Sequence, residues 1–134
     1  MEYYFAPMEG ITGYIHRNVH HSLFPGISKY FTAFIAPGQK GKFSAREKND
    51  ILPAHNQGIC TVPQLLTNNP RDFITTAAKL GELGYREINL NLGCPSRTVV
   101  TKYRGSGFLA KPRELGRFFE VVFSACKRGG EGPL

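Results

Sequence analysis

The chain has 134 residues, of which 41% are hydrophobic and 20% charged, and its formal net charge at pH 7 is +7. This length is enough for one ordinary domain with a hydrophobic core and too short for two of typical size. The composition excludes a low-complexity chain, and no apolar run approaches the length needed to cross a membrane. Because the first residues lack the features of a secretory signal, we expect a cytoplasmic protein with no membrane partner.

The predicted elements alternate between strands and helices. In chain order we expect strands at 3–6, 29–35, 59–66 and 87–92, and helical segments at 14–22, 45–50, from Asn69-Pro70 to Gly81 or Gly84, and at 112–126. A proline at position 63 weakens the centre of the third strand. The residues expected on the apolar side of the last helix are Leu115, Phe118, Phe119, Val122 and Phe123.

This alternation predicts an α/β fold with a parallel sheet. Four strand-helix units of roughly 33 residues each match the repeat of a (β/α)8 barrel of the TIM type, so the chain corresponds to about the first four units. A compact four-stranded α/β domain is the alternative. A dinucleotide-binding fold requires a G-x-G-x-x-G motif after its first strand, and this sequence has none there.

Positive charge is concentrated in the last third of the chain. From Arg97 to Arg128 eight basic residues accompany two acidic ones. Such an excess favours a polyanionic partner, although a solvated basic face without a partner has the same composition.

Metal binding is not expected. Cys60, Cys94 and Cys126 are odd in number and form no C-x-x-C pair, which argues against a zinc site or a disulfide framework. His16 and His20 are one helical turn apart, but they lack the glutamate of a metalloprotease motif and are expected at the surface.

The predicted strand ends carry polar groups that suit a flat heterocycle. Pro7 and Met8 follow the first strand and could lie under a ring, while the amides of Gln64 and Asn91 can donate and accept hydrogen bonds at the edge of a flavin or a nucleobase. The alternative is that Met8 fills the core and that the two amides serve as turn or capping residues.

Cys94 lies between Gly93 and Pro95, which fix the backbone around it. An ordinary cysteine thiol has a pKa of about 8.5, so it is mostly protonated at neutral pH and can act as a general acid. A nucleophilic role requires a nearby base, and no histidine is close in sequence.

Three motifs make this chain similar to the tRNA-dihydrouridine synthases. They are "APMEGIT" after the first strand, the glutamine of "PQLL" in the third, and "INLNLGCPS" followed by the basic loop "KYRGSGFL" at 102–109. The resemblance implies an FMN-dependent barrel that reduces a uridine of tRNA to 5,6-dihydrouridine, with NADPH as the reductant.

The same resemblance implies roles for seven residues. Cys94 would protonate C5 of the uracil while hydride is delivered to C6. Pro7, Met8 and Gln64 would contact FMN, and Asn91, Lys102 and Arg104 would bind the RNA substrate.

The resemblance also implies that residues 1–126 form the N-terminal half of a synthase barrel and that 127–134 form a tail. The second barrel half and the helical domain of full-length members are expected to be absent, so we expect this fragment alone to be inactive and to self-associate through its open barrel edge. Two other functions remain open: another flavin-dependent barrel that reduces C=C bonds, such as a dihydroorotate dehydrogenase, or a non-catalytic remnant that binds RNA.

Overall fold

The computed structural model describes residues 1–37 and 42–128, which form an α/β fold of short parallel strands and helices. The arrangement is consistent with part of a TIM-type barrel. In the order of the chain the elements are β1 (Tyr3–Phe5), α1 (Tyr14–Leu23), β2 (Ile27–Phe31), α2 (Ala45–Ile51), the 3-10 helix η2 (Pro53–His55), β3 (Thr61–Val62), β4 (Gln64–Leu65), α3 (Pro70–Glu82), β5 (Asn89–Leu90), α4 (Arg97–Val100), the 3-10 helix η3 (Gly105–Ala110) and α5 (Pro112–Arg128). The predicted tail lies outside the described residues from position 129 onward.

Every strand pair in the described residues is parallel. β2 lies between β1 and β3, β4 pairs with β5, and an isolated bridge from Ile35 to Leu65 joins the two groups. β1 and β5 each have one neighbouring strand in this part of the chain. Because parallel strands end at one edge of a sheet, the loops that follow them gather on one side of the molecule.

The strands are shorter than the sequence predicts. The expected strand at 59–66 is divided into β3 and β4 because Pro63, between them, has no N–H to donate to a neighbouring strand. The strand expected at 29–35 begins earlier and ends earlier, at Ile27–Phe31. Directly after it, the hydroxyl of the buried Thr32 accepts a hydrogen bond from the backbone N–H of Gln64 at 3.0 Å. The strand expected at 87–92 is limited to two residues, Asn89–Leu90.

The helices follow their capping signals. Asn69 accepts hydrogen bonds from the backbone N–H groups of Arg71 and Asp72 at 2.9 and 3.4 Å, which confirms the predicted start of α3. Ser44 and Glu47 form a capping box at α2. Between the strand expected at 87–92 and the helix expected at 112–126, where the sequence predicts no further element, the chain forms α4 and η3.

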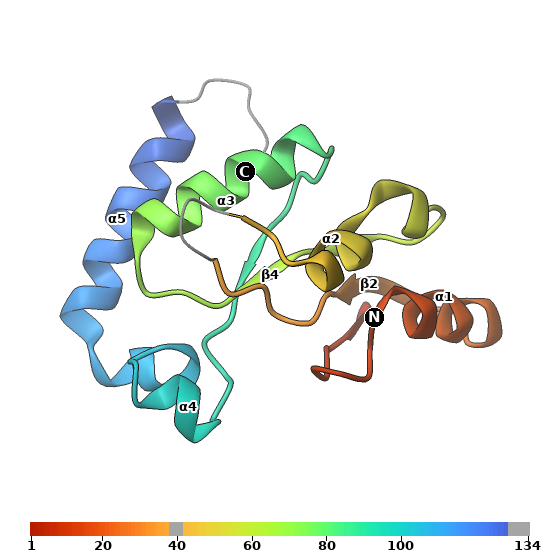
Figure 1. The fold of residues 1–134 in the computed structure, drawn as a ribbon, viewed down its shortest axis with the longest axis horizontal. Helices are drawn as coiled ribbons and strands as arrows, with labels where there is room; N and C mark the ends of the chain where they lie inside the picture. Colours follow the sequence, from red (N-terminus) through yellow and green to blue (C-terminus); the bar gives the residue numbers. More distant parts are fainter. Residues whose placement is uncertain (38–41, 129–134) are drawn as a thin grey trace.

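The main hydrophobic core lies where α3 and α5 pack side by side, at the opposite end of the molecule from α1 (Figure 1). Phe118 of α5 is 2% exposed and makes edge-on contacts with Phe73 and Phe108, each at 5.6 Å between ring centroids. Phe123, which is expected on the apolar side of α5, is 58% exposed because it lies beyond the face that meets α3. Its ring stacks on that of Phe119.

A buried arginine joins the N-terminal elements. Arg17 of α1 is 0% exposed, and its Nη1 donates to both carboxylate oxygens of Asp50 and to the carbonyl oxygen of Thr12, each at 3.1 Å. Its Nη2 donates to the carbonyl oxygen of Asp50 and to Oδ1 of Asn56, both at 2.9 Å. One guanidinium group therefore links α1, the β1–α1 loop, α2 and the segment after η2.

We expect Arg17→Ala to lower the free energy of unfolding by about 3–5 kcal/mol, because it leaves Asp50 and Asn56 without their buried partner. Arg46→Ala is the matched control, since Arg46 pairs with Glu9 at an exposed position and its loss should cost at most about 1 kcal/mol. Urea denaturation measures both. Equal losses in the two variants would contradict the central role of Arg17.

Tyr85 makes the free energy of unfolding depend on pH in alkaline solution. Its hydroxyl donates to the carbonyl oxygen of Ile51 at 2.8 Å, and burial raises its pKa from 10.0 to about 12. The folded protein therefore keeps this proton in a range where the unfolded chain releases it. The resulting stabilisation is complete below pH 10 and is lost as the pH rises towards 12.

We expect the free energy of unfolding of the unmodified chain to fall more steeply between pH 9.5 and 11.5 than that of Tyr85→Phe, which cannot ionise at this position. Urea denaturation at a series of pH values gives both curves. Tyr3→Phe, a change at a tyrosine 57% exposed, controls for the removal of a hydroxyl group. Parallel curves for the unmodified chain and Tyr85→Phe would contradict the assignment.

Candidate functional site

A cavity of about 540 Å³ lies at the carboxyl ends of the strands. Its lining comes from four strand ends and comprises Pro7, Met8 and Glu9 after β1, Ala33 and Phe34 after β2, Gln64 of β4, and residues 89–95 of β5 and the following turn. Pro7, Met8, Gln64, Asn91 and Cys94, which the sequence predicts as site residues, all line this one cavity. The parallel order of the strands explains why positions so distant in sequence meet there.

Three side-chain amides connect β4 to β5 at the cavity wall. Gln64, 8% exposed, donates from Nε2 to Oδ1 of Asn89 at 2.9 Å and accepts from Nδ2 of Asn91 at 2.7 Å. We call Asn89, Gln64 and Asn91 the amide network. Because each bond fixes the donor and acceptor ends of an amide, the network sets which polar groups face the cavity.

The amide network also holds the cysteine turn. Oδ1 of Asn91 accepts from the backbone N–H of Gly93 at 3.1 Å and from that of Cys94 at 2.9 Å. Asn91 therefore uses its oxygen on the turn and one N–H on Gln64, which leaves its second N–H for a bound molecule.

A second support holds the Cys94 carbonyl group. The backbone N–H and the hydroxyl of Ser106 donate to this oxygen at 3.1 and 3.0 Å. The preceding Gly105 has φ of 54°, and a Cβ atom there would lie 2.6 Å from the same oxygen. Only glycine allows η3 to approach Cys94 so closely.

The loop after β1 places Met8 at the rim. The hydroxyl of the buried Thr12 accepts from the Met8 N–H at 2.7 Å and donates to the Met8 carbonyl oxygen at 3.1 Å. The Met8 side chain is 59% exposed, so it does not serve as core filler.

Lys102 and Arg104 do not line the cavity but lie beside it. Both belong to the turn between α4 and η3, which Ser106 ties to Cys94. Lys102 is exposed, and its carbonyl oxygen accepts from Nδ2 of Asn68 at 3.1 Å. Within residues 1–37 and 42–128, neither cation forms an ion pair.

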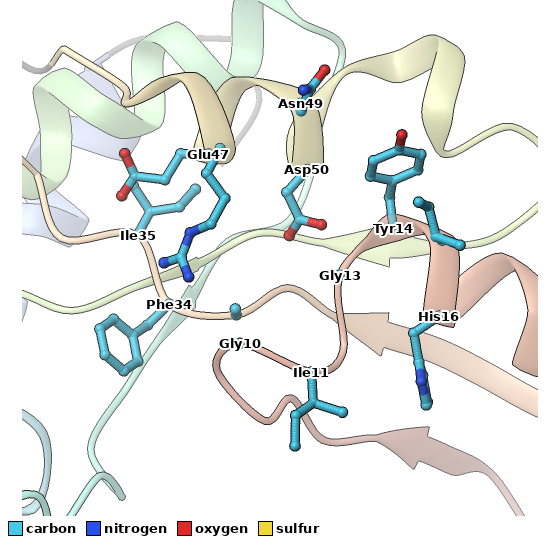
Figure 2. Close-up of a pocket in the computed structure, with 13 residues that line it drawn as sticks. Gly10, Ile11, Gly13, Tyr14, His16, Phe34, Ile35, Glu47, Asn49 and Asp50 are labelled. Atoms are coloured by element: carbon cyan, nitrogen blue, oxygen red, sulfur yellow. The ribbon is translucent and has the colours of Figure 1, made fainter.

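A second hollow of about 330 Å³ adjoins the cavity and shares Ala33 and Phe34 with it (Figure 2). Ile11 and Phe34 approach it from the loops, and Asp50 points into it from α2. Its charged groups already have partners: Asp50 binds Arg17, Arg46 binds Glu9, and Glu47 caps α2. The cavity with the unpaired thiol is therefore the better candidate site.

Asn89, Thr12 and Ser106 are supporting residues that the sequence analysis missed. Asn89 could have been found, because residues two apart in a strand share a face and Asn91 was already assigned to the site. Thr12 and Ser106 act through contacts to Met8 and Cys94 that no local pattern reveals.

Metal ligands do not gather in the described part of the chain, where no three of its histidine, cysteine and acidic residues form a potential metal site. His16 is exposed as expected, but His20 is half-buried and packs on Phe5, with ring centroids 4.5 Å apart. All three cysteines are free. Among the same residues, the helices are too short or too polar to cross a membrane.

Comparison with known proteins gives the family. A family model described as "Dihydrouridine synthase (Dus)" matches residues 4–128. The chain belongs to the dihydrouridine synthase family.

The relatives of this dihydrouridine synthase chain are longer proteins. It is 27% identical over 136 residues to a probable tRNA-dihydrouridine synthase of Staphylococcus aureus (strain COL), and the match covers 93% of this chain and 37% of that relative. The corresponding protein of Staphylococcus epidermidis (strain ATCC 12228) is 26% identical with the same coverage. A tRNA-dihydrouridine(20/20a) synthase of Vibrio vulnificus (strain CMCP6) is 38% identical over 66 residues, which are 49% of this chain and 20% of the relative. The chain thus spans little more than a third of the staphylococcal relatives.

Gly105→Ala should lower the free energy of unfolding by more than about 1–2 kcal/mol, because the new Cβ meets the Cys94 carbonyl oxygen and the backbone conformation is unfavourable for alanine. Gly116→Ala in α5 is the matched control, since a Cβ there meets nothing within 4 Å and alanine should stabilise the helix by about 0.5–1 kcal/mol. Urea denaturation measures both. A Gly105→Ala variant as stable as the unmodified chain would show that η3 does not press against Cys94.

Proposed function

We propose that this chain carries the proton-donating part of the active site of a tRNA-dihydrouridine synthase, an FMN-dependent oxidoreductase that reduces a uridine of tRNA with NAD(P)H. The observation that supports it is the gathering of Pro7, Met8, Gln64, Asn91 and Cys94 around one cavity in a chain of this family. We propose this activity for a whole protein of the relatives' length. This chain aligns with 37% of the Staphylococcus aureus relative.

The residues of the cavity fit a flavin ring. Pro7 and the exposed Met8 offer an apolar rim, and Gln64 keeps one N–H beyond its bond to Asn89 for the polar edge of the ring. When bound, FMN would supply the hydride for C6 of the uracil. Pro7, Met8 and Gln64 would hold and orient it.

Cys94 would complete the reduction of the C5=C6 bond. As hydride adds to C6, the Cys94 thiol transfers its proton to C5 and is left as a thiolate, which takes up a proton from solvent before the next turnover. Asn91 positions Cys94 through its oxygen, and its free N–H can donate to a uracil carbonyl. Lys102 and Arg104 would contact RNA phosphates beside the cavity.

We also propose that the chain is inactive alone and that residues 1–126 act as a half barrel in the cytoplasm. β1 and β5 leave two open edges in the described part of the sheet, and Tyr3 and Tyr4 on β1 are more than half exposed. Self-association, or pairing with another polypeptide, would cover these edges.

The role of Cys94 is tested in a chimera that joins residues 1–128 to the remaining part of the Staphylococcus aureus relative. Cys94→Ala should lower dihydrouridine formation on tRNA by about 10²- to 10⁴-fold, because the general acid is lost, while flavin binding is retained. Cys60→Ser, a change at an exposed cysteine outside the cavity, should leave the rate unchanged.

Turnover of Cys94→Ala at the rate of the unmodified chimera would remove the general-acid role. The isolated chain, incubated with FMN, NADPH and tRNA, should form no dihydrouridine. Steady turnover by this chain would contradict the proposal that it needs further polypeptide.

A further inference from the structure

Tyr103 has an unusual backbone conformation. Within residues 1–37 and 42–128 it is the one non-glycine residue with a positive φ, 50°. Bulky side chains rarely adopt this region, where glycine or asparagine is favoured. Residues held in such conformations often serve a function that the side chain supplies.

The Tyr103 ring is presented to solvent by a fixed turn. The backbone N–H of Tyr103 donates to Val100 O at 2.9 Å, and those of Lys102 and Arg104 donate to Val99 O at 3.1 and 3.2 Å. The ring is nevertheless 48% exposed, and no other aromatic ring of the described residues packs against it. Packing in the core therefore does not account for a tyrosine at this position.

One cation lies over the ring, and two more are its neighbours in the sequence. Nζ of Lys111 lies 4.6 Å from the ring centroid, and Lys102 and Arg104 flank Tyr103 in sequence. In the part of the chain that the structure describes, only Lys111 of these three has an acidic partner, Glu114 at 3.6 Å. An exposed aromatic ring among cations is the arrangement by which proteins hold single-stranded nucleic acid, with a base on the ring and phosphates on the cations.

The turn that carries Tyr103 is tied to the candidate site through η3. Tyr103 precedes η3 by two residues, and Ser106 of η3 binds the carbonyl group of Cys94. We propose that Tyr103 stacks on a nucleobase adjacent to the uridine presented to Cys94, while Lys102 and Arg104 contact the RNA backbone. This inference rests on the proposed function, since it takes tRNA as the ligand. A protein partner could pack against the exposed ring without needing two cations that lack ion pairs beside it in the sequence. RNA would use both the ring and the cations, so RNA is favoured.

The test measures binding of the 134-residue chain to an unmodified tRNA transcript by fluorescence anisotropy. Tyr103→Ala and Tyr103→Gly should each raise Kd roughly 5- to 150-fold, the effect of losing one stacked base. Tyr103→Phe keeps the ring and should stay within about twofold. Phe24→Ala, a change at a ring that is 61% exposed directly after α1, is the matched control and should leave Kd unchanged.

Tyr103→Gly separates binding from folding. Glycine accepts φ of 50° without strain, so this variant should have a higher urea midpoint than the unmodified chain even though it binds RNA more weakly. A loss of affinity in Tyr103→Phe equal to that in Tyr103→Ala would overturn stacking, because the hydroxyl and not the ring would then be responsible.

The outcomes distinguish this inference from the proposed function. If the unmodified chain binds tRNA and Tyr103→Ala and Tyr103→Gly bind it equally well, stacking is overturned and the proposed activity stands. If the unmodified chain does not bind tRNA at all, the role of Lys102 and Arg104 in substrate binding fails together with this inference.

Discussion

The buried guanidinium group of Arg17 is the interaction on which the N-terminal half of the structure depends. It draws Asp50 and Asn56 towards α1, and it also binds the carbonyl oxygen of Thr12. Thr12 in turn holds both backbone groups of Met8. A charge that does not line the cavity is thereby linked to the rim residue that we propose to contact the cofactor, because each step is a short hydrogen bond between buried or half-buried groups.

The other side of the cavity is held differently. There, the turn of Cys94 is supported from the sheet by Asn91 and from η3 by Ser106, which bind its N–H and its carbonyl group respectively. The close approach at Gly105 explains why a glycine-rich segment follows the cysteine at this distance. Loops are usually the mobile parts of a fold, but in this one both backbone polar groups of a single residue, Cys94, are bound.

Local signals predicted much of the fold and several of the residues that line the cavity. The Asn69-Pro70 pair determined the start of α3, and the motif around Cys94 led to the cavity because parallel strands end at one edge. Strand lengths could not be predicted, since a proline such as Pro63 interrupts a ladder whose partners are distant in sequence. The role of Arg17 was missed for the same reason: Asp50 lies 33 residues away, and nothing in the sequence near either residue identifies the other.

The composition of the cavity wall has a consequence for how the wall can hold a ligand. The amide network that shapes the wall consists of neutral groups, which bind by hydrogen bonds and not by charge. The lining contains no lysine, arginine or histidine, and its one acidic residue, Glu9, is paired with Arg46 at the surface. Screening by salt therefore acts on the contacts that we propose for Lys102 and Arg104 and leaves those of this wall nearly unchanged.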